Sequence, residues 1–246
     1  MPATLNLYLI RHGQTEYNAA GIVQGWCDSP LTAEGKAGAA QTGNAIAQAQ
    51  ISFAAAYCST SPRTAATAQI ILQHARQPHI TPVALDDLRE YHFGSFERQP
   101  SRHIHQTIAQ ELGYDSTEDW LADYRSGKHS NNQLMHTLHR IDPAAEQESQ
   151  FIRRLHRGIQ HIIANSLADI NQGSLKTSNA RFCEATTESS AQNVLIVSHG
   201  MAITALLRSI NPQAIAYRSV PNASATLLRY TPSGGLQIIG EAGKAL

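Results

Sequence analysis

The chain has 246 residues, of which 42% are hydrophobic and 15% are charged, so it is long and apolar enough to fold around a sizeable core. Lys plus Arg and Asp plus Glu number 19 each, which leaves no net charge when the histidines are neutral. This balance argues against a general binder of nucleic acids or membrane surfaces, and it means that any cationic site is local.

The cysteines and the apolar segments indicate a cellular compartment. Cys27, Cys58 and Cys183 are odd in number and widely spaced, which fits neither a disulfide framework nor a CxxC metal site. The chain opens without a signal-peptide pattern, and no apolar run is long enough to span a bilayer. We therefore expect a cytoplasmic protein.

The first expected strand runs from about Thr4 to Ile10 and ends abruptly in Arg11-His12-Gly13. In open α/β sheets, ligands bind at the carboxyl ends of the strands. An arginine presents a permanently charged planar fork that suits a phosphate, and a neutral imidazole nitrogen beside it can attack phosphorus. The tripeptide is also compatible with an ordinary strand end that carries solvated polar residues.

A loop over residues 18–31 and then a helix are expected next. Thr32 is a suitable N-cap, and Glu34 in the first turn complements the helix dipole. The alanine-rich sequence that follows predicts a helix as far as Ala49, although its glycines weaken that preference.

A second buried strand, Phe53 to Cys58, leads into another helix, with Ser61 as the N-cap and Pro62 at the first helical position. Arg63 lies in the first turn of this helix, where a cation opposes the dipole unless an anion binds there. The alternative is that Arg63 is a solvated surface residue, as most arginines are.

The middle of the chain contains a short strand and a segment of different composition. A third strand is expected within residues 79–85, followed by a loop over residues 88–97 in which aromatic residues surround Glu90. Residues 98–140 are polar, rich in histidine and weakly helical, which predicts an inserted, mostly helical cap. A long amphipathic helix is expected from Asp142-Pro143 to Leu167, and residues 169–192 are expected to form a polar surface loop.

The second half of the chain contains another buried strand that ends in a His-Gly pair. The buried strand Asn193–Val197 ends in Ser198-His199-Gly200, and a helix is expected over Met201–Ile210. Two strands that each deliver a His-Gly pair to one sheet edge are much harder to attribute to chance. Short strands are expected near residues 214–220, 225–230 and 236–239.

Strands that alternate with helices predict a three-layer α/β/α sandwich with a mostly parallel sheet. We expect residues 1–246 to form a single domain with the cap at about 98–140 as an insertion and the polar loop at about 169–192.

The motifs together resemble the histidine phosphatase superfamily, also called the phosphoglycerate mutase-like family. The matching segments are, in chain order, Arg11-His12-Gly13-Gln14-Thr15 with Asn18, Gln24-Gly25, Asp28-Ser29-Pro30-Leu31-Thr32, Ser61-Pro62-Arg63-Thr64-Ala65 with Thr67-Ala68, Glu90, Phe93-Gly94, Phe96-Glu97 and Ser198-His199-Gly200.

The resemblance implies a role for each matching residue. His12 would be the nucleophile that becomes phosphorylated, and Glu90 would be the acid and then the base. The phosphoryl oxygens would be surrounded by Arg11, Arg63 and a protonated His199, with no metal or cofactor. Further substrate contacts are implied for Asn18, Gln24 and Gly25. The substrate would be a small phosphorylated metabolite, and oligomeric state is not readable from the sequence.

Within this family the sequence favours a phosphatase, a histidine acid phosphatase-like phosphomonoesterase, over a mutase. Phosphoglycerate mutases resemble one another in a tryptophan followed by paired arginines in a longer lid. Here Trp120 is followed by Leu121-Ala122, and paired arginines occur downstream only at Arg153-Arg154. A mutase that moves a phosphoryl group between the hydroxyls of a small metabolite is the alternative.

Two further classes of protein are compatible with parts of the sequence. A metalloenzyme would use pairs among the 12 histidines, such as His103 with His105 or His136 with His139, but no cysteine or HExxH pattern completes a site. A non-catalytic protein that binds phosphorylated ligands would need neither a nucleophile nor an acid. Candidate cap contacts to a second anionic group of the substrate are Arg98, Arg102, His103, Arg125 and Lys128.

Overall fold

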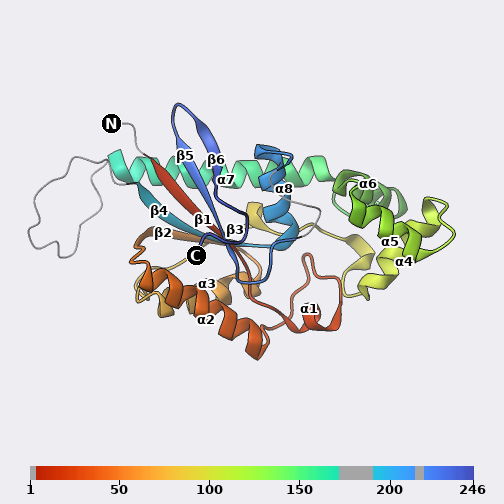
Figure 1. Cartoon of the computed structure of the whole chain (residues 1–246), viewed down its shortest axis with the longest axis horizontal. Helices are drawn as coiled ribbons and strands as arrows, with labels where there is room; N and C mark the ends of the chain where they lie inside the picture. Colours follow the sequence, from red (N-terminus) through yellow and green to blue (C-terminus); the bar gives the residue numbers. More distant parts are fainter. Residues whose placement is uncertain (1–3, 172–190, 214–218) are drawn as a thin grey trace, which may run out of the picture.

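The computed structural model describes residues 4–171, 191–213 and 219–246. Its centre is a six-stranded sheet in the order β3-β2-β4-β1-β5-β6, in which β3, β2, β4 and β1 are parallel and β5 and β6 are antiparallel additions (Figure 1). The strands are β1 (Leu5–Arg11), β2 (Phe53–Ser59), β3 (Val83–Leu85), β4 (Gln192–Ser198), β5 (Ala225–Thr231) and β6 (Gly235–Ile239). The expected mostly parallel sheet is confirmed.

Helices cover both faces of this sheet (Figure 1). The helices α7 (Glu148–Asn171) and α8 (Gly200–Ile210) bury isoleucines and leucines against one face, together with Leu7 of β1. The helices α2 (Ala33–Gln48) and α3 (Pro62–His74) bury alanines, isoleucines and a leucine against the other face, together with Ile10 of β1. Because successive strand residues face opposite sides of a sheet, this alternation produces the predicted three layers.

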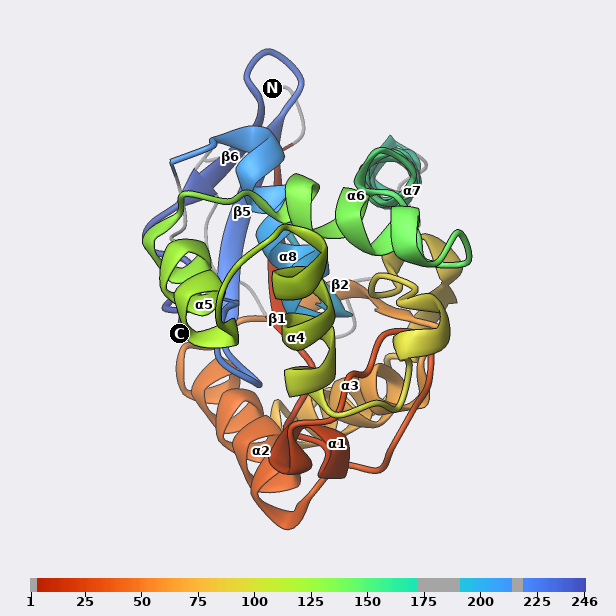
Figure 2. The same ribbon diagram turned by 90° about the vertical axis from the view of Figure 1, so that its right-hand side faces the viewer.

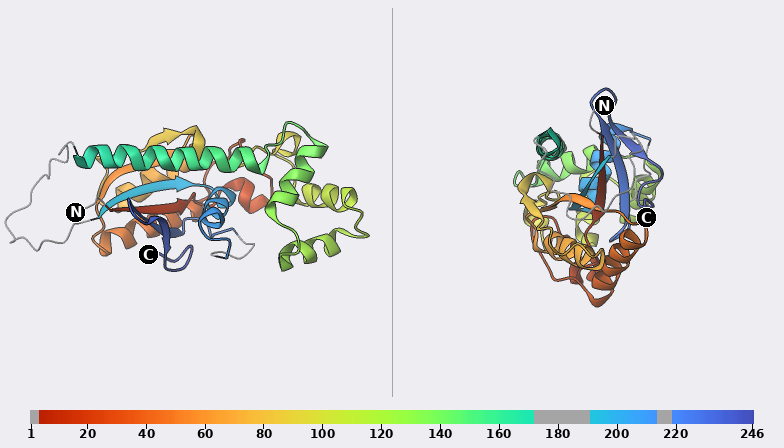
Figure 3. Two further views of the ribbon diagram at one scale, coloured as in Figure 1. Left: turned by 90° about the horizontal axis from the view of Figure 1, so that it is seen from above. Right: turned by 90° about the vertical axis from the view of Figure 1, so that its left-hand side faces the viewer.

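Three further helices lie together at one end of the molecule (Figures 2 and 3). They are α4 (Ser101–Glu111), α5 (Thr117–Ser126) and α6 (Asn131–Ile141), and they pack around the fully buried indole of Trp120. Figure 3 shows β4 pointing toward this end, so the three helices lie beyond the carboxyl ends of the parallel strands. Among the described residues, no helix is long and apolar enough to cross a membrane.

The boundaries of several elements differ from the prediction. The helix α1 (Glu16–Ala20) lies where a loop was expected, because Thr15 and Asn18 form a capping box. The strand β3 covers only the last three residues of the range 79–85, and α7 begins at Glu148 rather than near Pro143. The polar loop predicted for 169–192 lies mostly outside the described residues, as does the strand predicted for 214–220, of which the described residues 219 and 220 are not in a strand.

The N-caps of the two helices that cover one face also differ from each other. Thr32 Oγ1 accepts a hydrogen bond from the Gly35 N–H at 3.0 Å, as predicted for the start of α2. Ser61 precedes α3 and Pro62 is its first residue, but the Ser61 hydroxyl bonds Ser59 Oγ rather than the helix backbone. The first N–H groups of α3 therefore receive no cap from Ser61.

Candidate active site

The carboxyl ends of the parallel strands bring the two His-Gly sequences together. Arg11 is paired with Ser198 in the register of β1 and β4, so His12 and His199 follow at neighbouring positions of one sheet edge. Their ring centroids are 5.3 Å apart, and both side chains are buried.

The hydrogen bond of His12 determines which ring nitrogen carries its proton. His12 Nδ1 lies 2.8 Å from the carbonyl oxygen of Gly13, and a carbonyl oxygen can only accept, so Nδ1 carries the proton. Burial lowers the pKa of His12 well below 6.5, and the positive charges of Arg63 and Arg11 lower the pKa further. At neutral pH the imidazole is therefore uncharged, with a lone pair on Nε2, which is the state that a nucleophile requires.

His199 is also neutral in the ligand-free protein, whereas the resemblance implies a protonated imidazole around a bound phosphoryl group. Arg63 Nη2 donates to His199 Nδ1 at 3.0 Å, so the remaining proton is on Nε2 and points to Ser59 Oγ at 2.9 Å. Burial and the charge of Arg63 lower the pKa of His199 well below 6.5. The positive charge of this site therefore comes from the arginines in the ligand-free protein.

Arg63 is not a solvated surface residue. Its guanidinium is buried and donates to Asp28 Oδ1 at 2.8 Å and to the carbonyl oxygens of Gly25 and Cys27 at 2.8 and 2.9 Å. Arg11 Nη1 donates to the carbonyl oxygen of Val220 at 2.7 Å.

Each of these two arginines also keeps one donor without a partner. The Nε atoms of Arg11 and Arg63 are buried, and neither has an acceptor among the described residues. A buried guanidinium N–H without an acceptor is costly, and an anion placed between the two arginines would supply one.

Glu90 lies close to this cationic cluster, in the loop that follows β3. Its carboxylate accepts hydrogen bonds from the backbone N–H of Met201 at 2.9 Å and of Tyr91 at 3.1 Å. Burial raises the pKa of Glu90 above its ordinary value, although these bonds and the charges of Arg63 and Arg11 partly oppose the shift. A buried carboxyl with a raised pKa keeps its proton to a higher pH than an ordinary carboxyl does, which suits a proton donor.

A buried ion pair holds the backbone around Glu90 in place. Arg154 of α7 binds both carboxylate oxygens of Glu146, at 2.7 and 2.8 Å. The same guanidinium donates to the carbonyl oxygens of Arg89 at 2.7 Å and Glu90 at 2.6 Å. In the sequence, Arg154 is recognisable only as part of an arginine pair, because its contact with the Glu90 loop depends on the fold.

Glu97 organises the loop that supplies the carbonyl partners of Arg63. Its carboxylate accepts hydrogen bonds from the backbone N–H groups of Gly25, Trp26, Cys27 and Phe93, at distances between 2.8 and 3.1 Å. Burial alone raises the pKa of Glu97, but the hydrogen bonds from Cys27, Trp26 and Phe93 outweigh it and leave the pKa below 4.5.

Replacement of Glu97 with glutamine should therefore destabilise the protein by about 2 kcal/mol or more, because the amide group turns donors toward backbone N–H groups that lose their acceptor. The measurement is chemical denaturation at pH 7. The matched control is Glu111→Gln, which breaks only the exposed pair with Arg140 and should cost less than about 1 kcal/mol.

The effect of Glu97→Gln should also depend on pH. Since the pKa of Glu97 in the folded protein lies below 4.5, its carboxylate stabilises the fold above that pH and loses this contribution as the pH falls through the folded pKa. The difference between the wild type and the variant should shrink accordingly in acid. A difference that is small at pH 7, or that does not change with pH, would contradict this role of Glu97.

The remaining predicted contact residues lie at the edge of the site. Asn18 Oδ1 accepts from the Thr15 N–H at 3.2 Å, and it lies 3.4 Å from Asn222 Nδ2, which also donates to the His12 carbonyl. Gln24 is tied to Thr15 and Ser29 by its side-chain amide. Gly25 reaches the site through its carbonyl oxygen, which Arg63 binds.

A side chain at Gly13 would clash with the backbone at the start of α2. A Cβ on Gly13 would lie 2.5 Å from the Gly35 carbonyl oxygen, and a Cβ on Gly35 would lie 2.0 Å from the Gln14 carbonyl oxygen. Both glycines therefore allow the start of α2 to pack against the loop after β1. The close approach is between two backbone segments of the protein.

The histidine pairs weighed as metal ligands are not part of a cluster. Among the residues that the structure describes, no group of three or more His, Cys, Asp or Glu side chains is arranged to hold a metal ion. His139 Nδ1 is bonded to the Ala145 carbonyl oxygen at 2.7 Å, and His105 Nδ1 accepts from the Trp120 indole at 3.4 Å.

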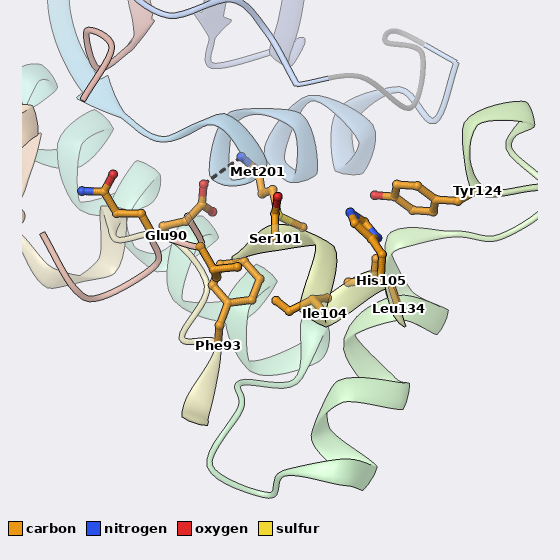
Figure 4. Close-up of a pocket in the computed structure, with 10 residues that line it drawn as sticks. Glu90, Phe93, Ser101, Ile104, His105, Tyr124, Leu134 and Met201 are labelled. Carbon is orange, nitrogen blue, oxygen red and sulfur yellow. Dashed lines mark hydrogen bonds between the residues drawn. The ribbon is translucent and has the colours of Figure 1, made fainter. Parts of the chain in front are cut away.

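A cavity of about 290 Å³ lies beside Glu90, between the sheet edge and the cap helices (Figure 4). Its lining comes from the loop after α1, the Glu90 loop, all three cap helices and the start of α8. The residues are Val23, Gln24, Glu90, Phe93, Ser101, Ile104, His105, Tyr124, Leu134 and Met201. The five cationic cap candidates named from the sequence are not among them.

Similarity to known proteins covers most of the chain. Residues 7–177 and 176–238 match the family model of the histidine phosphatase superfamily (branch 1). A 2,3-bisphosphoglycerate-dependent phosphoglycerate mutase from Neisseria meningitidis serogroup C is 26% identical over 212 residues, which cover 84% of this chain and 85% of the mutase.

Solved structures agree with this match. A phosphoglycerate mutase from Bacillus anthracis is 27% identical, with a TM-score of 0.81 over 97% of this chain and 93% of that one. A mycobacterial glucosyl-3-phosphoglycerate phosphatase is 18% identical, with a TM-score of 0.66 over 98% of this chain and 100% of that one, a likeness that shows the fold. Because the family model matches most of the sequence, the chain belongs to branch 1 of the histidine phosphatase superfamily, as the motifs had indicated.

Proposed function

We propose that the chain is a phosphomonoesterase that works through a phosphohistidine on His12 and requires no metal ion. The observation that carries this proposal is the pair of buried Nε–H groups of Arg11 and Arg63, for which the described part of the chain offers no acceptor. The charges of both arginines lower the pKa of the neutral His12 imidazole, so an anion bound by them would lie near the nucleophile. A phosphoryl group is the anion that these three side chains fit together.

In the first step, His12 Nε2 attacks phosphorus and the bond from phosphorus to the alcohol oxygen breaks. Glu90 gives its proton to the departing oxygen, which the raised pKa of this carboxyl favours. The Gly13 carbonyl oxygen keeps its hydrogen bond to Nδ1–H and supports the positive charge that the ring gains. Arg11 and Arg63 balance the charge on the phosphoryl oxygens.

In the second step, the Glu90 carboxylate takes a proton from water while the water oxygen attacks phosphorus. The bond between phosphorus and His12 Nε2 breaks, inorganic phosphate leaves, and both His12 and Glu90 return to their starting protonation states. The same two residues thus serve both half-reactions with no net change.

A phosphoglycerate mutase is the second candidate, because relatives at 26–27% identity carry that name. The contacts and exposure of the arginine pair Arg153-Arg154 in α7 favour the phosphatase. Arg154 is engaged by Glu146 and by backbone carbonyls, so it is not available to a phosphorylated substrate, and Arg153 is exposed on α7. Trp120 is fully buried in the cap, where its indole N–H donates to His105.

An assay of phosphate release distinguishes a phosphatase from a mutase and from a protein that only binds phosphate. We expect purified protein in excess chelator to release inorganic phosphate from alkyl and aryl phosphomonoesters, with no stimulation by 2,3-bisphosphoglycerate. Conversion of 3-phosphoglycerate to 2-phosphoglycerate without phosphate release would instead identify a mutase. Binding of inorganic phosphate without turnover of any ester would identify a non-catalytic protein.

A further inference from the structure

The residues that line the cavity beside Glu90 determine which alcohol groups of a substrate can bind there. Glu90, the proton donor of the proposed first step, is one of the lining residues (Figure 4), so the alcohol part of an ester that Glu90 protonates would face this cavity. The chemistry of the lining therefore acts directly on the leaving group.

Half of the lining is apolar. Phe93, Ile104 and Leu134 are buried side chains of the Glu90 loop, α4 and α6, and Val23 and Met201 complete the apolar part. In Figure 4, Ile104 lies between Glu90 and His105. An alkyl or aromatic group placed there would remove its own apolar surface and that of the lining from water, which favours binding.

Within the part of the chain that the structure describes, the polar lining carries no positive charge. None of the ten lining residues is a lysine or an arginine. His105 at the far end accepts a hydrogen bond from the Trp120 indole on Nδ1, and burial and the charge of Arg125 lower its pKa below 6.5, so it is neutral. Gln24, Ser101 and Tyr124 provide uncharged polar groups.

A second anionic group on the leaving alcohol is disfavoured in such a cavity. A carboxylate or a second phosphate would lose its water against Phe93, Ile104 and Leu134 without meeting a cation of the described lining, and it would lie near the Glu90 carboxyl. The size of the cavity sets an upper limit for the uncharged group. An apolar cavity of about 150 Å³ holds benzene, so about 290 Å³ accommodates roughly a two-ring group or a medium alkyl chain.

We infer that the substrates of this chain are phosphomonoesters of uncharged, largely apolar alcohols, with the alcohol bound in the cavity formed by the Glu90 loop and the cap helices. This inference rests on the proposed phosphatase function and names its substrate class. The same residues discriminate against small phosphorylated acids.

A matched series of esters tests the inference on the wild-type protein. From ethyl through butyl to hexyl phosphate, kcat/KM should rise about threefold to fourfold for each added methylene. Against hexyl phosphate, 5-carboxypentyl phosphate has the same chain length but ends in a carboxylate, and its kcat/KM should be lower by about 100-fold or more.

A charge placed in the cavity should reverse this preference. Ser101 is the first residue of α4, is exposed and lines the cavity, so Ser101→Lys adds an ammonium group there with little disturbance of the core. We expect the ratio of 5-carboxypentyl to hexyl phosphate turnover to rise at least about tenfold. The matched control is Gln106→Lys, which adds the same charge on an exposed position of α4 outside the cavity and should leave the ratio unchanged.

The outcomes separate this inference from the function on which it rests. A kcat/KM that does not depend on chain length, or equal turnover of the two six-carbon esters, overturns the substrate class while the protein remains a phosphatase. Turnover of p-nitrophenyl phosphate without turnover of the alkyl series also overturns the substrate class, and no turnover of any of these esters overturns the proposed function itself. The wild-type series decides the matter even if Ser101→Lys fails to fold.

Discussion

Replacement of His12 with alanine should lower kcat/KM for every phosphomonoester by about 10⁴-fold or more, the range of losses seen when a covalent nucleophile is removed. The reason is the state of the imidazole in the folded protein. Its Nδ1–H is held by the Gly13 carbonyl oxygen and its pKa is lowered by burial and by two arginines, so the Nε2 lone pair is ready to attack at neutral pH. In the variant, water would have to attack phosphorus in place of His12, and in the proposed mechanism water is activated only after Glu90 has given up its proton in the first step.

The covalent intermediate provides the direct measurement. Wild-type protein mixed briefly with substrate and quenched should carry a phosphate that is stable in base and labile in acid, as expected for a phosphohistidine, and His12→Ala should carry none. His161→Ala, an exposed histidine on α7, is the matched control and should be phosphorylated at the wild-type level. An equal yield of phosphoprotein from His12→Ala would place the nucleophile elsewhere.

Binding of inorganic phosphate shows whether His12→Ala keeps its site. Arg11 and Arg63 retain their protein contacts in this variant, because none of these contacts involves the His12 side chain. Phosphate should therefore still bind and raise the melting temperature of the variant. This separates a lost nucleophile from a lost fold.

The predictable part of this site follows from the position of polar residues at strand ends. His12, Arg63 and His199 each come directly after, or within a few residues of, a buried apolar strand of the parallel sheet, so the topology alone brings them to one edge. The same pattern predicts the sandwich, because buried strands alternate with helical segments. Local sequence is sufficient for both.

The contacts between distant segments could not be predicted. Glu97 acts on residues about 70 positions earlier in the chain, and Arg154 acts on a loop about 65 positions earlier. Neither residue interrupts a hydrophobic period or lies at a strand end, so the sequence contains no local signal for its role. The neutral state of His199 likewise depends on the direction from which Arg63 approaches its ring.

The missed helix α1 has a more local cause. Its capping box uses Asn18 at the position where the usual sequence signature has Glu or Gln, and the helix is only five residues long. Propensity and periodicity have little weight over such a length.

Replacement of Glu90 with glutamine should separate two kinds of substrate. An alkoxide is a poor leaving group that must be protonated as the bond to phosphorus breaks, whereas p-nitrophenolate leaves with little help. General-acid catalysis typically contributes 10²- to 10⁴-fold. The variant should therefore lose about this factor in kcat/KM on an alkyl phosphate and much less on p-nitrophenyl phosphate. This ratio reports the steps through phosphorylation of His12 and excludes the later attack of water.

The raised pKa of Glu90 also predicts the pH dependence of the alkyl reaction. The first step needs a protonated Glu90, so kcat/KM should fall as the pH rises through the raised pKa of this carboxyl. His12 must be unprotonated, so kcat/KM should also fall in acid, but only well below pH 6.5 because the pKa of His12 is lowered. In Glu90→Gln the alkaline fall attributable to Glu90 should disappear, while the fall in acid should remain.

The matched control is Glu146→Gln, which disturbs the same loop without removing the acid. Glu146 holds Arg154, and Arg154 binds the carbonyl oxygens beside Glu90, so this variant should weaken the alkyl and aryl reactions together. If Glu90 is only a structural partner of the nearby cations, Glu90→Gln should behave in the same way as Glu146→Gln. Equal losses on the two esters, together with an unchanged fall of kcat/KM at high pH, would show that Glu90 does not transfer the proton.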